Sequence, residues 1–134
     1  MNKNFAQAHT RTRADHATEV REDYVEAIAD LIEKNGVCRV VNLAARFGVS
    51  HVSVIQVVQR LKMDKLVEKE AYRPVTLTPK GLRLAQVCRE RHDVVYRFLL
   101  HLGVSEGVAT LDAEGLEHHL SAETLDRIRD FIKA

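Results

Sequence analysis

The sequence predicts a mostly α-helical protein that contains one short β hairpin. Only six glycines and two prolines interrupt the 134 residues, so long helices are expected. Apolar residues recur at three- and four-residue steps over most of the chain. Two short alternating segments near the middle, 66–70 and 75–78, are the exception, and they are typical of paired strands. The length suits one compact unit, or a small module with an accessory segment.

The N-terminal third predicts an arm and then a helix. Residues 1–18 hold few large apolar side chains, which is typical of a flexible arm. From Glu19 the apolar residues follow a helical period, as Tyr24 and Ile28 illustrate. Asn35 and Gly36 tolerate a left-handed backbone and should end this helix.

The next segment predicts a helix-turn-helix. A short amphipathic helix over 41–47 precedes Gly48, which can adopt the positive φ of a tight turn, and Ser50, which can cap a second helix over 51–63. Ala44 is small where the two helices must approach closely. The side chains expected to pack between the helices are Leu43, Phe47, Val54, Val57 and Leu61.

The predicted strands 66–70 and 75–78 flank a loop over 71–74 and form a hairpin. Thr78 can then cap a further helix with Pro79 at its first position. Helix, helix-turn-helix, two-stranded wing and new helix together predict a winged helix-turn-helix domain over residues 19–80.

The C-terminal part, residues 81–134, is expected to be a helical domain. One helix should run from Pro79 to His101, a second from Ser105 to His119, and a third from Ser121 to Ile132. These helices are too few for an independent core, so they should pack on the winged helix and on a second subunit. A homodimer is therefore expected.

Composition excludes several classes of protein. No apolar run reaches the length of a membrane helix, and the polar N-terminus has no secretory signal, so we expect a cytoplasmic protein. Cys38 and Cys88 lie far apart, which argues against a disulfide scaffold or a cysteine zinc site, and both should be small buried hydrophobes. Sparse aromatic residues argue against stacking on single-stranded nucleic acid.

The net charge of +1 hides a strong segregation of charge. Residues 39–91 contain eleven Lys and Arg against four Asp and Glu, whereas the rest of the chain contains nine against fifteen. A basic middle is typical of a polyanion-binding unit, and acidic ends favour cations, although solvated surface charge can also cluster.

An acidic and histidine-rich cluster predicts a metal site. Glu114, Glu117 and His118 share one face of the predicted helix, and adjacent carboxylates repel each other unless a cation or a proton lies between them. An oxygen-rich set with imidazoles and no thiolate suits Mn²⁺, with Fe²⁺ or Zn²⁺ as competitors. Surface acids paired with Lys and Arg are the alternative. The six candidate ligands are Asp23, Glu26, His92, Glu114, Glu117 and His118.

Other potentially reactive groups have simpler interpretations. His119 points away from the face of Glu114, and His101 lies near a helix end that favours an imidazolium, so neither is expected to be a ligand. The sequence contains no phosphate-binding glycine loop, nucleophile elbow or HExxH motif. We therefore do not expect an enzyme.

These motifs resemble those of the diphtheria toxin repressor (DtxR) family of metal-dependent transcriptional regulators, and within it the manganese transport regulator (MntR) branch. The resemblance extends over residues 22–132. The segments that carry it are Asp23–Glu26, Leu43–Ser50, Tyr72–Thr78, Glu90–His92 and Asp112–His119.

The resemblance implies that the six candidate ligands form a two-metal manganese site. Glu114 and Glu117 would then serve both ions, Asp23 and His118 would hold one ion, and the other two ligands would hold the second. Iron-selective relatives carry Met and Cys in place of Asp23 and Glu114. The harder oxygens favour manganese, because soft ligands select tighter-binding metals. Whether one or two ions bind each subunit is left open.

Double-stranded DNA with a palindromic operator is the expected partner. His51-Val52 stands where relatives often have proline, Gln56 replaces a basic residue, and Pro74 replaces a wing-tip glycine, so the operator sequence is open. The residues expected to contact DNA are Ser50, His51, Ser53, Gln56, Arg60 and Arg73.

The predicted function is a Mn²⁺-activated repressor of manganese uptake genes. Three alternatives stay open: an Fe²⁺- or Zn²⁺-responsive regulator of the same family, a regulator that responds to another ligand, and a carboxylate-bridged dinuclear metalloenzyme. The winged helix argues against the enzyme.

Overall fold

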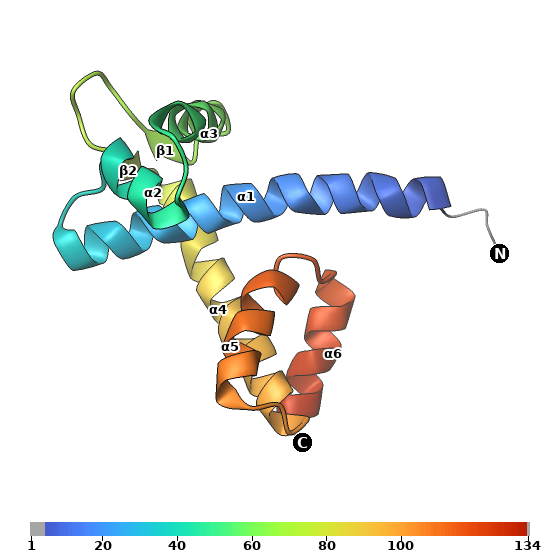
Figure 1. The fold of residues 1–134 in the computed structure, drawn as a ribbon. Helices are drawn as coiled ribbons and strands as arrows, with labels where there is room; N and C mark the ends of the chain where they lie inside the picture. The colour runs from blue at the N-terminus through green and yellow to red at the C-terminus, as the bar shows by residue number, and fades with distance from the viewer. Residues whose placement is uncertain (1–4, 134) are drawn as a thin grey trace. The chain divides into compact units, whose positions relative to one another are not determined.

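The computed structural model describes residues 5–133, and the first part of the predicted arm, residues 1–4, lies outside them. The chain divides into two compact units, one formed by residues 21–86 and the other by residues 1–20 together with 87–134. The elements in chain order are α1 (Phe5–Asn35), α2 (Val40–Phe47), α3 (His51–Met63), β1 (Val67–Glu68), β2 (Thr76–Leu77), α4 (Pro79–His101), α5 (Glu106–Leu116) and α6 (Ala122–Lys133) (Figure 1).

The unit of residues 21–86 contains the predicted helix-turn-helix. The axes of α2 and α3 bend by 112° at the turn between them, within the range of this motif. Gly48 has a φ of +64° and ends α2, and the Ser50 hydroxyl accepts a hydrogen bond from the Ser53 amide at 3.1 Å. The turn glycine and the serine cap are thus confirmed.

The core of this unit forms where α1 meets the helix-turn-helix. The rings of Tyr24 and Phe47 stack with centroids 4.3 Å apart, and Leu43 and Val54 are completely buried. Burial also raises the pKa of the Tyr24 hydroxyl. On α3 the prediction was partly wrong, because Val58 is buried whereas Val57 is only half-buried.

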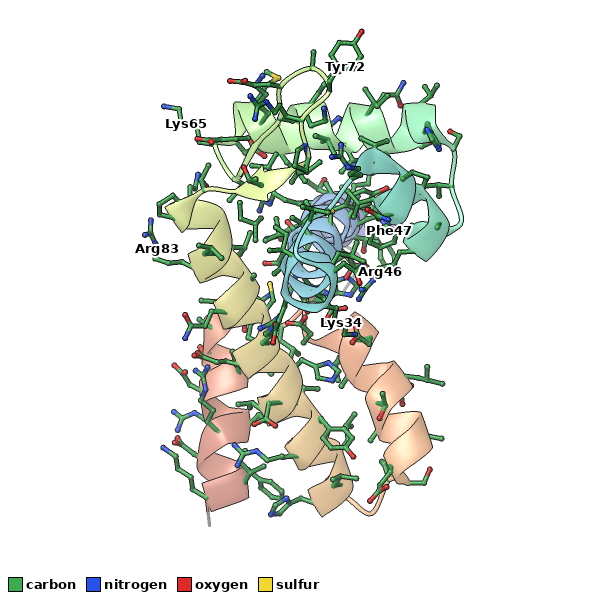
Figure 2. The ribbon with its side chains drawn as sticks, turned by 90° about the vertical axis from the view of Figure 1, so that its left-hand side faces the viewer. Lys34, Arg46, Phe47, Lys65, Tyr72 and Arg83 are labelled. Carbon is green, nitrogen blue, oxygen red and sulfur yellow. The ribbon has the colours of Figure 1, made fainter. Side chains whose placement is uncertain are left out.

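At the end of α1, ion pairs join that helix to α2. Asp30 accepts hydrogen bonds from Arg46 on α2 and from Lys34 one turn along α1. The Arg46 guanidinium is the main reason that the pKa of Asp30 is lowered. Arg46 and Phe47 lie on the same short helix, beside this end of α1 (Figure 2).

The wing is an antiparallel hairpin in which Val67 pairs with Leu77 and Glu68 with Thr76. Each strand has only two residues, fewer than predicted. Cys38 extends the hairpin through an isolated bridge to Val75. Cys38 is completely buried, as predicted, and this burial raises the pKa of its thiol to about 11.

Gly81 fixes the start of α4 against the wing. A Cβ atom at this position would lie 2.1 Å from the Leu66 carbonyl oxygen. The Thr78 hydroxyl accepts a hydrogen bond from the Gly81 amide at 3.1 Å, as expected of the predicted cap. The helix and the strand can approach this closely only because the residue has no side chain.

The second unit has a hydrophobic core of its own, contrary to our expectation that the C-terminal helices would be too few. Side chains of α4, α5 and α6 pack together because each helix presents an apolar stripe to the other two. The rings of Phe98 and Phe131 meet edge to face with centroids 5.5 Å apart. The buried members of this core are Val94, Val95, Leu99, Ala109, Ala113, Leu125 and Ile128.

Two helix boundaries differ from the sequence prediction. The first helix begins at Phe5 and not near Glu19, where alanines and the pair Arg11–Asp15 support the added turns. Helix α5 ends at Leu116 and does not reach His119. Glu117 and the two histidines that follow it therefore lie in a turn.

Among the described residues, no single helix is long and apolar enough to cross a membrane, and the bent pair α2–α3 reaches that length only in combination.

Candidate functional site

Helix α4 presents His92 to α5. The Nδ1 atom of His92 lies 3.6 Å from Oε1 of Glu114. The ring stacks on Tyr96 one turn further along α4, with centroids 6.4 Å apart, and this contact fixes its orientation. Within the described residues, Nδ1 is buried and makes no hydrogen bond. A buried ring nitrogen in that state can serve as a metal ligand.

The turn after α5 presents Glu117 and His118. Both side chains are 0% exposed, and Oε1 of Glu117 lies 3.2 Å from Nε2 of His118. The other carboxylate oxygen, Oε2, accepts a hydrogen bond from Nε of Arg91 at 2.9 Å. A buried carboxylate requires such a partner, because burial without compensation is costly. Arg91 therefore fixes one oxygen of Glu117 and turns the other toward the imidazole.

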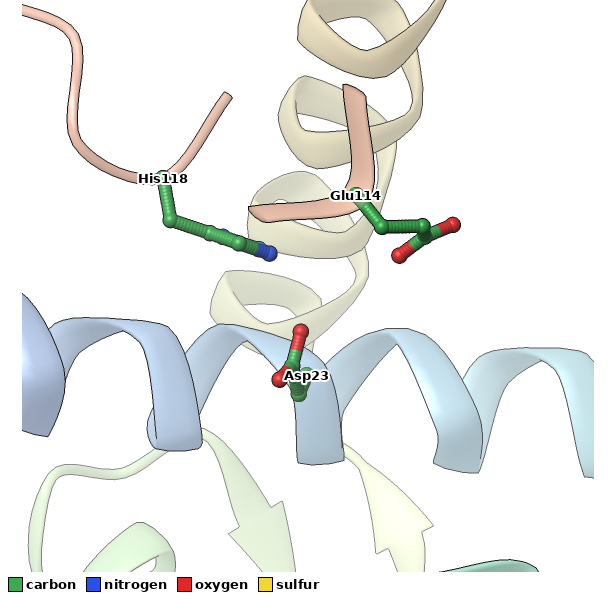
Figure 3. Close-up of side chains that lie close together, drawn as sticks. All are labelled: Asp23, Glu114 and His118. Carbon is green, nitrogen blue, oxygen red and sulfur yellow. The ribbon is translucent and has the colours of Figure 1, made fainter. Parts of the chain in front are cut away.

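Glu114 links these two parts of the site. Its carboxylate and the His118 imidazole have ligand atoms within 4.8 Å of each other, and Figure 3 shows both side chains, together with Asp23 of α1. Four of the six predicted ligands are thus gathered within the second unit: His92, Glu114, Glu117 and His118. Two carboxylates and two imidazoles form a donor set that fits Mn²⁺ or Fe²⁺.

The remaining two predicted ligands belong to the other unit. Asp23 and Glu26 lie three residues apart on α1, so they occupy neighbouring turns on one side of the helix. Both side chains are half-buried.

Cys88 is a neighbour of the site that the sequence did not reveal. It is completely buried, as predicted, but its Sγ atom lies within 4.8 Å of a Glu117 oxygen and accepts a hydrogen bond from Nη2 of Arg91 at 3.5 Å. Its position one helical turn before His92 is the only signal in the sequence.

The predicted DNA-contacting residues lie on the surface of the winged helix. All six are exposed, five of them at the start or along α3 and one in the wing loop. The Ser50 hydroxyl donates to the Ser53 hydroxyl at 3.0 Å, so these two side chains stabilise the start of α3 in addition to being accessible.

Two further features of this surface escaped the sequence analysis. Tyr72 in the wing loop is 98% exposed and has a φ of +64°, which is uncommon for an aromatic residue, and its ring points outward (Figure 2). An open groove at the base of the wing is lined by five basic side chains and by the acidic side chains of Glu68 and Glu70. The basic side chains are those of Lys62, Lys65, Lys69, Lys80 and Arg83.

Comparisons with known proteins identify the family. The model described as the N-terminal DNA binding domain of the iron dependent repressor matches residues 16–75, and the model of its metal binding and dimerisation domain matches residues 78–134. A transcriptional regulator MntR of Escherichia coli O6:H1 is 50% identical over 121 residues, which cover 90% of this chain and 78% of the relative. The chain belongs to the DtxR family of metal-dependent transcriptional regulators, in its MntR branch.

More distant relatives agree with this assignment. An HTH-type transcriptional regulator MntR of Geobacillus kaustophilus is 43% identical over 84% of this chain and 79% of its own length. Two solved structures are 30% identical over 84% of this chain: a manganese-dependent transcriptional repressor in complex with manganese, with a TM-score of 0.74, and the manganese regulator SloR, with a TM-score of 0.72. The chain spans about half the length of these two structures.

This membership confirms the predicted fold class and the prediction of a transcriptional regulator rather than an enzyme.

Proposed function

We propose that this protein is a Mn²⁺-activated repressor that binds a palindromic operator of manganese uptake genes as a homodimer in the cytoplasm. The observation that carries the proposal is the continuous series of ligand atoms from His92 through Glu114 and His118 to Glu117. Its support comes from relatives that are named manganese regulators or solved with manganese.

In this proposal Asp23 and Glu26 complete the ligand set. Six ligands, four of them carboxylates, would hold one or two divalent ions and offset the repulsion between Glu114 and Glu117. Manganese would supply positive charge and no redox chemistry. Softer thiolate or thioether ligands at these positions would favour metals that bind more tightly than manganese.

The metal would act on the helix-turn-helix through α1. Asp23 and Glu26 lie on the same continuous helix whose C-terminal end bonds to α2 through Asp30 and Arg46. Binding of the ion would restrict the freedom of the winged helix relative to the rest of the subunit. In a dimer this restriction would hold two recognition helices at the spacing of successive major grooves. By linkage, DNA would raise the affinity for metal by the same factor.

On the DNA we assign base contacts and backbone contacts to different residues. Gln56 can pair with adenine, and His51 and the two serines can contact several bases. Arg60 and Arg73 would bind phosphates, since both side chains are exposed on the surface of the winged helix.

The test is a titration of the full-length protein with operator DNA in the presence of Mn²⁺, Fe²⁺, Zn²⁺ or a chelator. Affinity should be highest with Mn²⁺ and fall by roughly ten- to a hundredfold in the chelator. Equal affinity under all four conditions would refute a metal-activated switch. Activation by Fe²⁺ or Zn²⁺ alone would reassign the metal.

A further inference from the structure

The turn that carries Glu117 and His118 is the least regular part of the proposed metal site. Helix α5 ends at Leu116, and the turn continues with a bond from the His119 amide to the Leu116 carbonyl at 3.1 Å. The next helix begins only at Ala122. The positions of these two side chains therefore depend on contacts from outside the turn.

The N-terminal half of α1 supplies two such contacts, and both are made to His119. Nη2 of Arg11 donates a hydrogen bond to the His119 carbonyl at 3.0 Å. Oε2 of Glu19 lies 2.9 Å from Nε2 of the His119 ring. Asp15, one turn after Arg11, pairs with the Arg11 guanidinium at 3.5 Å and orients it.

These contacts give His119 a structural role in the turn. Its Nε2 atom is occupied by Glu19, and the residue directly follows His118 in the chain. Both its main chain and its side chain are held by α1, so it anchors the turn.

We propose that Arg11, Asp15 and Glu19 form an N-terminal brace on His119 that positions Glu117 and His118 and so sets the affinity of the site for metal. This inference rests on the proposed function. The physical reason is preorganisation, since groups that orient metal ligands alter metal affinity by roughly ten- to a hundredfold. The match to the DNA-binding domain of the family begins at residue 16, so Arg11 and Asp15 precede it.

The experiment measures Mn²⁺ affinity of the full-length protein by isothermal titration calorimetry. The Arg11→Ala substitution should weaken Mn²⁺ binding by about tenfold, and Glu19→Gln should weaken it by a smaller factor. Arg11→Lys keeps a donor to the carbonyl and should restore part of the affinity. Arg13→Ala is the matched control, because Arg13 has the same charge, lies on the same helix and, among residues 5–133, donates its side-chain hydrogen bond to Thr10 of that helix.

Two further measurements separate a positioning role from a purely structural one. The melting temperature without metal should be the same for Arg11→Ala and Arg13→Ala, and the electron paramagnetic resonance spectrum of bound Mn²⁺ should change only in Arg11→Ala. Unchanged affinity in Arg11→Ala, or an equal loss in Arg13→Ala, would overturn the brace.

The Glu114→Ala variant tells the two proposals apart. If it loses Mn²⁺ binding while Arg11→Ala does not, the proposed function stands and the brace is wrong. If wild-type protein binds no Mn²⁺, the proposed function fails and the brace falls with it.

Discussion

The two units of this protein place their functional groups in opposite environments. In the winged helix, the predicted DNA contacts are exposed side chains on top of an apolar core. In the other unit, the side chains of Glu117 and His118 are 0% exposed. A surface contact can be removed with little effect on the fold, whereas a buried ligand is coupled to its neighbours.

Substitutions in the two units should therefore change different measured quantities. Substitution of a DNA-contacting residue should change the affinity for DNA by the same factor with and without metal, because the residue acts on the protein–DNA complex directly. Substitution of a predicted metal ligand should change only the ratio of the DNA affinities measured with and without metal.

Gly81→Ala should lower the free energy of unfolding of the winged helix by about 3 kcal/mol, because its Cβ would overlap the Leu66 carbonyl. Urea denaturation followed by circular dichroism measures this. Gly107→Ala in α5 is the control, since within residues 5–133 its added Cβ would meet no atom within 4 Å apart from its chain neighbours and the backbone of its own helix. It should be neutral or stabilising by up to about 1 kcal/mol. Equal losses in the two variants would refute the close approach.

His118→Ala should reduce the affinity for operator in Mn²⁺ to the value measured in chelator, a change of roughly 2 kcal/mol. Fluorescence anisotropy with labelled operator measures both states. Affinity in chelator should stay at the wild-type value. A His118→Ala protein that still responds to Mn²⁺ would remove His118 from the ligand set.

Arg73→Ala should weaken DNA binding by about 1 kcal/mol with and without Mn²⁺, and lower the salt dependence by about one phosphate contact. Titrations with operator and with unrelated DNA at several salt concentrations measure this. Loss of affinity for operator alone would make Arg73 a base-reading residue. A change in the ratio of the DNA affinities measured in Mn²⁺ and in chelator would contradict the assignment of Arg73 as a direct DNA contact.

Asp30→Asn should destabilise the winged helix by about 0.5–1 kcal/mol at neutral pH, because it removes the ion pairs with Arg46 and Lys34. Since the folded-state pKa of Asp30 is lowered, these pairs stabilise the fold above the ordinary aspartate pKa and are lost as the pH falls through the folded-state value. The free energies of unfolding of the variant and the wild type should differ at neutral pH and should become equal at strongly acidic pH.

Asp126→Asn serves as the control for this last prediction. Asp126 pairs with Arg129 on the exposed surface of α6 and should contribute almost nothing. A similar loss in both variants would show that the Asp30 pairs have no special role.

Local signals in the sequence were sufficient to predict the helix-turn-helix and the wing. Gly48, Ser50, Thr78 and Pro79 act within a few residues of their own position, and their conformations depend on local sterics and capping. The spacing of acidic and histidine residues likewise predicted the candidate metal ligands, and the motifs that contain them resemble those of the DtxR family. The arm predicted over residues 1–18 is helical from Phe5 onward, as the first part of α1.

The way in which the predicted C-terminal ligands meet depends on tertiary packing. The sequence predicted Glu114, Glu117 and His118 on one helical face, but α5 ends at Leu116 and the last two lie in a turn. The salt bridge from Arg91 to Glu117 joins residues on different elements, and the bond from Arg11 to His119 joins segments from opposite ends of the chain. Such contacts form only after the helices have packed, and no periodicity within a single helix encodes them.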